Sequence, residues 1–131
     1  MSDPSTTLVI PVLRLADRAT LDWLASAVGF EISDITPDDH GGLHHAKLWW
    51  GRDCIMASTS PSEGEHVGAA AIYLTLATDA AVDDAFERAT AAGAEAVRPP
   101  VDQPYGGRGA TIRDPEGNQW SFGSYLPELP A

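Results

Sequence analysis

The sequence predicts an α+β fold built from two βαβββ modules, and two observations carry this prediction. Strand-like runs and amphipathic helical stretches follow one another in the order strand, helix and three strands, and this order then repeats. Segments at matching places in the halves are also alike: Leu13-Arg-Leu-Ala16 matches Leu74-Thr-Leu-Ala77, and Gly29-Phe-Glu-Ile32 matches Gly93-Ala-Glu-Ala96. Because one module leaves a sheet face and an edge uncovered, two modules are expected to pair, within one chain or between chains.

The first module is predicted over about residues 8–59. Its opening run, Leu8–Leu15, is rich in β-branched residues and predicts a strand, with Pro11 at an edge or a strand end. Asp17 is the expected N-cap of a helix that ends at Gly29. The apolar stripe of this helix is Leu21, Leu24, Ala25 and Val28. The remaining predicted segments are strands at 30–35, 43–50 and 54–58, a loop at 36–42, a turn at 51–53 and a linker at 60–68.

The second module is predicted over about residues 69–126 and repeats this order. A strand at 70–76 is followed by a helix capped by Thr78 or Asp79 and closed by Gly93. The apolar stripe of this helix is Val82, Ala85, Phe86 and Ala89. Asp114-Pro-Glu-Gly117 suits a type I turn. The other predicted segments are strands at 94–98, 108–113 and 119–125 and a loop at 99–104.

Length and composition favour one domain over residues 1–131. Apolar residues make up 44% of the chain and charged residues 21%, which is ordinary for a globular protein. No apolar run approaches the ~20 residues of a membrane-spanning helix, and the polar start of the chain has no signal-peptide pattern, so we expect a cytoplasmic protein without a membrane partner. The single cysteine, Cys54, excludes an intrachain disulfide and a cysteine-rich zinc site, and we expect it to be an inert thiol.

The balance of acidic and basic residues limits the classes of binding partner that we expect. Eight basic and nineteen acidic residues give a formal net charge of −11, which repels nucleic acid phosphates and attracts cations. Nucleic acid is therefore not an expected partner. A cationic small molecule would be attracted, although a high acidic charge also serves solubility alone, and both interpretations stay open.

Several motifs resemble the vicinal-oxygen-chelate superfamily, which contains glyoxalases, bleomycin-resistance proteins and extradiol dioxygenases. Tyr105-Gly-Gly-Arg108 and the following Arg113–Gly123 are similar to its closing hairpin. Asp22–Leu24, Val28–Glu31 and His45–Leu48 are similar to its first module. The resemblance implies curved mixed sheets around a cleft, the glyoxalase/bleomycin-resistance fold. Members of the superfamily carry out several chemistries or sequester antibiotics, so the fold alone does not select a function.

The resemblance also implies a member that has lost its metal site. Metal-dependent members carry His, Glu or Gln at four positions, which alignment places on Ile10, Met56, Ala71 and Ser121. Strand alternation places the same four side chains toward the cleft. None is a ligand that a catalytic divalent ion prefers. We therefore expect no metal and no cofactor, which makes glyoxalase, epimerase and dioxygenase activity less favoured.

The remaining cleft is predicted to be an apolar small-molecule site with a few polar groups. We expect Ala71 and Gly123 to leave room for a ring and Tyr105 and Arg108 to lie at the cleft mouth. Trp49 is expected to act either as a stacking platform or as part of the core or of a dimer interface. The candidate ligand-binding residues are Ile10, Val12, Arg14, His45, Trp49, Met56, Ala71, Tyr73, Tyr105, Arg108 and Ser121.

Two functions follow from this site, and a third stays open. The first is a homodimer that sequesters an aromatic or cationic compound, such as an antibiotic, without converting it. The second is a metal-free lyase or isomerase, with His45 or Tyr73 transferring a proton and Arg14 or Arg108 holding an anion. The third is glyoxalase-like or dioxygenase chemistry with a metal held by unexpected ligands. His44 and His45 do not favour it, because adjacent strand residues point to opposite faces.

Overall fold

The structure, a computed structural model, describes residues 8–59 and 66–128, so most of the predicted linker at 60–68 lies outside the described residues. The first module contains β1 (Val12–Arg14), α1 (Arg18–Trp23), the π-helical turn η1 (Leu24–Val28), β2 (Glu31–Pro37), β3 (Leu43–Trp50) and β4 (Asp53–Ser58). The second contains β5 (Ala71–Thr75), α2 (Asp79–Ala91), β6 (Glu95–Asp102), β7 (Arg108–Arg113) and β8 (Gln119–Gly123). The predicted α+β fold of two βαβββ modules is confirmed.

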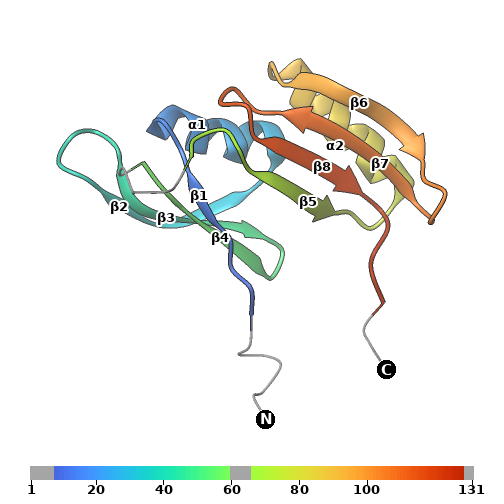
Figure 1. The fold of residues 1–131 in the computed structure, drawn as a ribbon, viewed down its shortest axis with the longest axis horizontal. Coiled ribbons are helices and arrows are strands. Elements are labelled where there is room, and N and C mark those ends of the chain that lie inside the picture. The colour runs from blue at the N-terminus through green and yellow to red at the C-terminus, as the bar shows by residue number, and fades with distance from the viewer. Residues whose placement is uncertain (1–7, 60–65, 129–131) are drawn as a thin grey trace, which may run out of the picture.

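Each module forms one mixed four-stranded sheet, and the two sheets have the same topology (Figure 1). The strand orders are β1-β4-β3-β2 and β5-β8-β7-β6. The first strand of each module pairs in parallel with its last strand, so that Val12 lies opposite Met56 and Tyr73 lies opposite Ser121. The other pairings are antiparallel. Pro11 immediately precedes the edge strand β1, as predicted.

The helices begin and end at the predicted residues. The Asp17 carboxylate accepts a hydrogen bond from the Thr20 amide at 3.3 Å, and the Thr78 hydroxyl accepts one from the Ala81 amide at 3.1 Å. Gly29 and Gly93 follow the two helices with φ angles of 109° and 101°, a backbone conformation that glycine adopts without strain. No helix of the described residues is long and apolar enough to cross a membrane.

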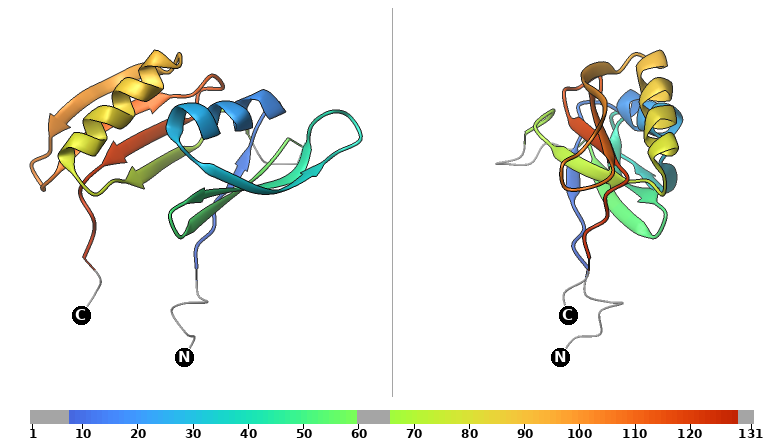
Figure 2. Two further views of the ribbon diagram at one scale, coloured as in Figure 1. Left: turned by 180° about the vertical axis from the view of Figure 1, so that it is seen from behind. Right: turned by 90° about the vertical axis from the view of Figure 1, so that its right-hand side faces the viewer.

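The two helices lie on one side of the molecule, and the modules share one hydrophobic core (Figure 2). Phe30, in the first module, packs edge-on against Trp50 of its own sheet, with ring centroids 5.3 Å apart. The same ring packs against Trp120 of the second module at 5.4 Å. Trp120 is fully buried, and its indole N–H donates to the Asp114 carboxylate at 2.9 Å.

Side chains of three residues also donate hydrogen bonds from one module to the other within one chain. The Trp23 indole N–H donates to the Ala92 carbonyl at the C-terminal end of α2, at 2.9 Å. In return, the Arg88 guanidinium of α2 donates to the Ala27 and Val28 carbonyls at the end of η1, at 3.2 and 2.6 Å. The Trp50 indole N–H donates to the Thr75 carbonyl at 2.8 Å. The helices therefore cap each other, and these contacts fix how the two modules sit together.

Several predicted boundaries are wrong. The strand expected at 119–125 ends at Gly123, and β2 continues into the predicted loop at 36–42 as far as Pro37. The loop expected at 99–104 is largely strand, because β6 continues through Pro99 and Pro100 to Asp102. This is compatible with proline because β6 is an edge strand whose pairing with β7 shifts register between Ala96 and Val101. The strand expected from Leu8 pairs only from Val12, although the Pro11 carbonyl still accepts from the Met56 amide at 3.0 Å.

Candidate functional site

Strand alternation separates a core face from an uncovered face in both sheets. Leu13 and Leu15 are buried on the core side, whereas the preceding Val12 is 56% exposed. The same alternation buries Trp120 and Phe122 and leaves Ser121 half-buried on the other face. The predicted cleft-facing positions therefore do lie on the uncovered faces.

A pocket of about 520 Å³ lies between the two modules. Its walls are the segment before β1, the adjoining ends of β3 and β4, and β5. Four of the predicted ligand-binding residues line it: Ile10, Trp49, Met56 and Tyr73. The other lining residues are Leu8, Val9, Pro11, Lys47, Trp50, Arg52, Asp53, Cys54, Ile55, Ile72, Leu74 and Thr75.

Hydrogen bonds from β2 hold one wall of this pocket. The Trp49 indole N–H donates to the Ser33 hydroxyl at 2.8 Å, and the Lys47 ammonium pairs with the Asp34 carboxylate at 2.8 Å. The hydrogen bond and charge of Lys47 lower the pKa of Asp34, and those of Asp34 raise the pKa of Lys47. Asp34 has a φ of 53°, which is uncommon for a residue other than glycine, and it lies at a register irregularity of β2. The polar groups beside Trp49 are thus fixed before any ligand arrives.

Cys54 lines the pocket as a protonated thiol. Desolvation by burial raises its pKa above the ordinary value, against a smaller lowering by the nearby Lys47 charge. A nucleophilic cysteine needs a lowered pKa, so this environment suits a packing role.

Tyr73 closes the space that was expected to admit a ligand ring at Gly123. A Cβ at Gly123 would collide with the Tyr73 ring, so the protein's own phenol occupies that place. The Tyr73 hydroxyl donates to the Tyr125 carbonyl at 2.8 Å. Burial, followed by the proximity of Tyr105, raises the Tyr73 pKa. The expectation of room at Gly123 is therefore wrong, because the ring of the neighbouring strand fills it.

A second, shallower hollow of about 350 Å³ adjoins Tyr73. It is lined by Tyr73, Tyr105, Tyr125 and Pro127. The rings of Tyr105 and Tyr125 meet edge to face, with centroids 5.0 Å apart and planes at 78°. Tyr105 thus lies beside Tyr73 in this second hollow and is not among the residues that line the first pocket.

Apart from Arg108, the other predicted residues lie on the uncovered faces, outside these two hollows. The Arg14 guanidinium donates to the Ser58 hydroxyl at 2.9 Å. His45, half-buried, lies opposite Thr36 of β2. Ala71 is exposed, and the Ser121 hydroxyl is hydrogen-bonded to that of Thr111 at 2.8 Å. Neither Val12 nor these residues line the pocket of Trp49.

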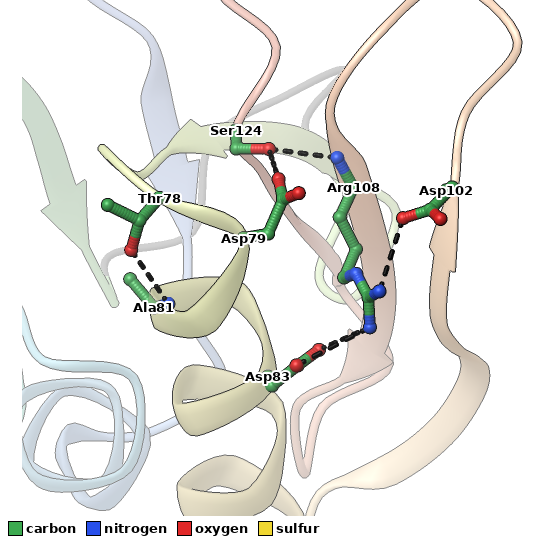
Figure 3. A network of polar contacts seen from close by, with 7 residues as sticks. All are labelled: Thr78, Asp79, Ala81, Asp83, Asp102, Arg108 and Ser124. Atoms are coloured by element: carbon green, nitrogen blue, oxygen red, sulfur yellow. Dashed lines mark hydrogen bonds and ion pairs between the residues drawn. The ribbon is translucent and has the colours of Figure 1, made fainter.

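Arg108 is not among the residues that line the pocket. Its guanidinium pairs with Asp83 of α2 and with Asp102 of β6, each at 3.2 Å (Figure 3). The hydrogen bond and charge of Asp83, followed by the charge of Asp102, raise its pKa. Arg108 shares its side of β7 with the buried Ala110 and Ile112, so its side chain extends toward the helix. Its predicted position over a ligand is therefore wrong.

The donors present do not fit a divalent metal. The four positions inherited from metal-dependent proteins carry Ile10, Met56, Ala71 and Ser121, and the only oxygen among these side chains is already bonded to Thr111. Across residues 8–59 and 66–128, no three His, Cys, Asp or Glu side chains gather closely enough to hold a metal ion.

Sequence reasoning missed two parts of the site. It did not assign Arg52 or the segment ahead of Ile10 to the pocket, nor Tyr125 and Pro127 to the tyrosine hollow. Alternation gives no signal for these residues, because they lie in a turn or beyond a strand end. For Lys47 the signal existed, since it shares the face of Trp49.

Comparison with known proteins supplies the family. The Glyoxalase profile, described as the Glyoxalase/Bleomycin resistance protein/Dioxygenase superfamily, matches residues 16–122. The chain belongs to this superfamily. No protein with a curated function matches the sequence significantly.

Among the solved superfamily folds, TioX from Micromonospora sp. ML1 is similar with 30% identity, a TM-score of 0.74, and coverage of 92% of this chain and 99% of TioX. Lactoylglutathione lyase from Agrobacterium tumefaciens is 20% identical with a TM-score of 0.71, covering 92% and 95% of the two chains. A glyoxalase/bleomycin resistance protein/dioxygenase from Nocardioides is 20% identical with a TM-score of 0.67, covering 99% and 92%. The last two likenesses concern the fold alone.

Proposed function

We propose that this glyoxalase-superfamily protein is a metal-independent binding protein that holds a small, partly aromatic organic compound without converting it. The observation that carries the proposal is the pocket of about 520 Å³ between the modules, lined by Trp49, Met56, Ile10 and Tyr73. Its volume lies within the range of small-molecule sites, which are concave, mainly apolar and supplied with a few polar groups.

The lining suits a flat ligand. Trp49 is anchored through its indole N–H to Ser33, so its position is set in advance for stacking. Met56 is a flexible, polarizable side chain that adapts to the outline of a ligand. The charged residues of the lining, Lys47, Arg52 and Asp53, offer polar contacts to substituents of the ring.

The chemistry of the nearby acid–base groups favours binding over conversion. A general base must lie within hydrogen-bond reach of its substrate, and His45 is not among the residues that line the pocket. The raised pKa of Tyr73 keeps its hydroxyl protonated, and that hydroxyl already donates a hydrogen bond to the Tyr125 carbonyl, so it is not available as a base. Cys54 also keeps its proton. The lyase or isomerase alternative thus has no well-placed proton acceptor among these three side chains.

A homodimer is part of the proposal. The uncovered faces present Val12, Tyr73 and, ahead of β1, the nearly fully exposed Val9. Large apolar side chains gathered on one face are typical of an interface. A second copy placed over these faces would bury them and enclose the ligand. Sedimentation velocity checks this: a dimer at micromolar concentration is the expected result, and a monomer contradicts it.

Tryptophan fluorescence tests the binding function. We expect a screen of aromatic antibiotics and metabolites to yield a compound that quenches emission with one-to-one stoichiometry per chain and is recovered unchanged after denaturation. Trp49→Ala should weaken its binding about five- to tenfold, from the loss of ring stacking. Arg98→Ala, on the exposed edge strand β6 and outside the pocket, is the control. A chemically altered compound, or binding that is lost after dialysis against a chelator, would overturn the proposal.

A further inference from the structure

We propose that Tyr73, Tyr105 and Tyr125 form a separate subsite for an organic ammonium cation, of the quaternary or methylated alkylammonium class. The subsite is the 350 Å³ hollow that these residues line with Pro127. Tyr73 also lines the pocket of Trp49, so the two hollows adjoin through one side chain. The inference goes beyond the proposed function, because it concerns a different surface and a charged class of ligand.

The three rings are held in place before a ligand binds. Tyr73 lies over Gly123 and is tied through its hydroxyl to the Tyr125 carbonyl at 2.8 Å. Tyr105 is set against Tyr125 by their edge-to-face contact. The loop that carries Tyr105 lies close to the last strand, since a Cβ at Gly107 would lie 2.8 Å from both the Ser124 hydroxyl oxygen and the Tyr125 amide nitrogen. The walls of the hollow are therefore fixed by contacts on three sides.

The rings also stay accessible. Tyr73, Tyr105 and Tyr125 are 42%, 60% and 37% exposed, so each ring keeps surface that a ligand can reach. The face of a phenol ring carries negative electrostatic potential, and several rings around one hollow are the known way in which proteins recognise alkylammonium groups. The hollow is shallow, so it suits a head group of a larger molecule or a small free cation.

The charges of the chain favour a cation. No basic side chain lines the hollow. Arg108, the basic side chain at the start of the adjoining strand β7, extends toward α2 and is paired with Asp83 and Asp102 (Figure 3). The chain as a whole carries a net charge of −11, so the surroundings attract cations at long range.

An isosteric pair of probes separates charge from shape. Choline is titrated into ¹³C-tyrosine-labelled protein, and the ring signals are followed by NMR; the same titration uses 3,3-dimethylbutan-1-ol, which replaces the ammonium nitrogen by carbon. We expect choline to shift the Tyr105 and Tyr125 ring signals saturably. The neutral alcohol should bind more weakly than choline, by a factor of about five or more. Equal affinities, or no saturable shift with choline, would overturn the subsite.

Two variants of the most exposed ring make the test specific. Tyr105→Ala should weaken choline binding about fivefold, because it removes one aromatic face, whereas Tyr105→Phe should keep it, because the face remains. Unchanged binding in Tyr105→Ala, or equal loss in both variants, contradicts the ring-face mechanism. The aromatic screen is run on the same unaltered protein. Tryptophan quenching without a choline response overturns only the subsite, and a choline response without quenching overturns only the proposed function.

Discussion

Gly123 and Tyr73 share one small space between β8 and β5, the strands that carry them. A methyl group at residue 123 would overlap the phenol ring, so the ring would have to leave its hydrogen bond to Tyr125. Gly123→Ala should therefore lower the free energy of unfolding by about 1–3 kcal/mol, the usual cost of overpacking. Urea denaturation followed by circular dichroism measures this.

A double variant checks the physical reason for that loss. In Tyr73→Ala the ring is absent, so adding Gly123→Ala should cost clearly less than it does in the unaltered protein. If the two changes are simply additive, Tyr73 is not what excludes a side chain at position 123.

Cys54 gives a prediction that depends on pH. Burial raises the pKa of its thiol, so the folded protein keeps the proton at pH values where a free cysteine begins to ionise. We expect iodoacetamide at pH 8–9 to alkylate Cys54 several times more slowly in the folded protein than in the same chain in urea. Equal rates would show that the thiol is not shielded.

The raised pKa of Cys54 also determines the direction in which the unfolding free energy changes with pH. A pKa that is raised on folding adds stability that is fully present below the unfolded thiol's pKa. That contribution is lost as the pH rises through the folded value. The unfolding free energy should therefore decrease in alkaline solution, and Cys54→Ser should reduce this dependence.

At the scale of elements, the helices depend on each other's ends. Arg88 of α2 donates to two carbonyls that end η1, and its guanidinium lies 2.6 Å from the place where a Cβ at Gly29 would be. Carbonyls at a helix end are favourable partners for a cation. Arg88→Ala should cost about 1 kcal/mol of stability by thermal or urea unfolding. Arg98→Ala, on the exposed edge strand β6, is the control and should cost little.

Most elements were predictable because their signals are local. The caps at Asp17 and Thr78, the closing glycines and the alternation in β3, β4 and β8 depend on neighbouring residues, and all of these predictions are confirmed. The extension of β6 through Pro99 and Pro100 was not predictable, because proline is tolerated only where a strand lies at a sheet edge. The order of the strands within each sheet was not predictable either, because it depends on the tertiary fold and has no local signal.

At the scale of the whole molecule, the modules share a core and are not independent. Phe30 packs on Trp120 across the module boundary, and Trp50 donates to Thr75. Either module alone would expose this apolar surface to water. We expect residues 1–65 or 66–131, expressed separately, to lack a cooperative unfolding transition and dispersed NMR signals. A cooperative transition in either fragment would show that the shared core is dispensable.

The candidate site was only partly predictable for the same reason. Ile10, Trp49, Met56 and Tyr73 follow from alternation and resemblance, and the structure brings them to one pocket. The approach of Ile10, Trp49 and Met56 to Tyr73 of β5 depends on how the modules pack, and no local sequence pattern predicts that packing. The position of Arg108 could have been predicted, since it shares its strand face with Ala110 and Ile112. Whether the gathered residues bind a ligand remains a prediction.

The parallel pairing of first and last strands in each module has a consequence for folding kinetics. Arg14 meets Ser58, which lies 44 positions later, and Ala70 meets Asn118, which lies 48 positions later. Neither sheet can close until a loop of this length has been brought together, an entropic cost that slows the search for the native state. During translation, the helix and the hairpin of β2 and β3 would emerge early, while β1 would wait for β4 to leave the ribosome.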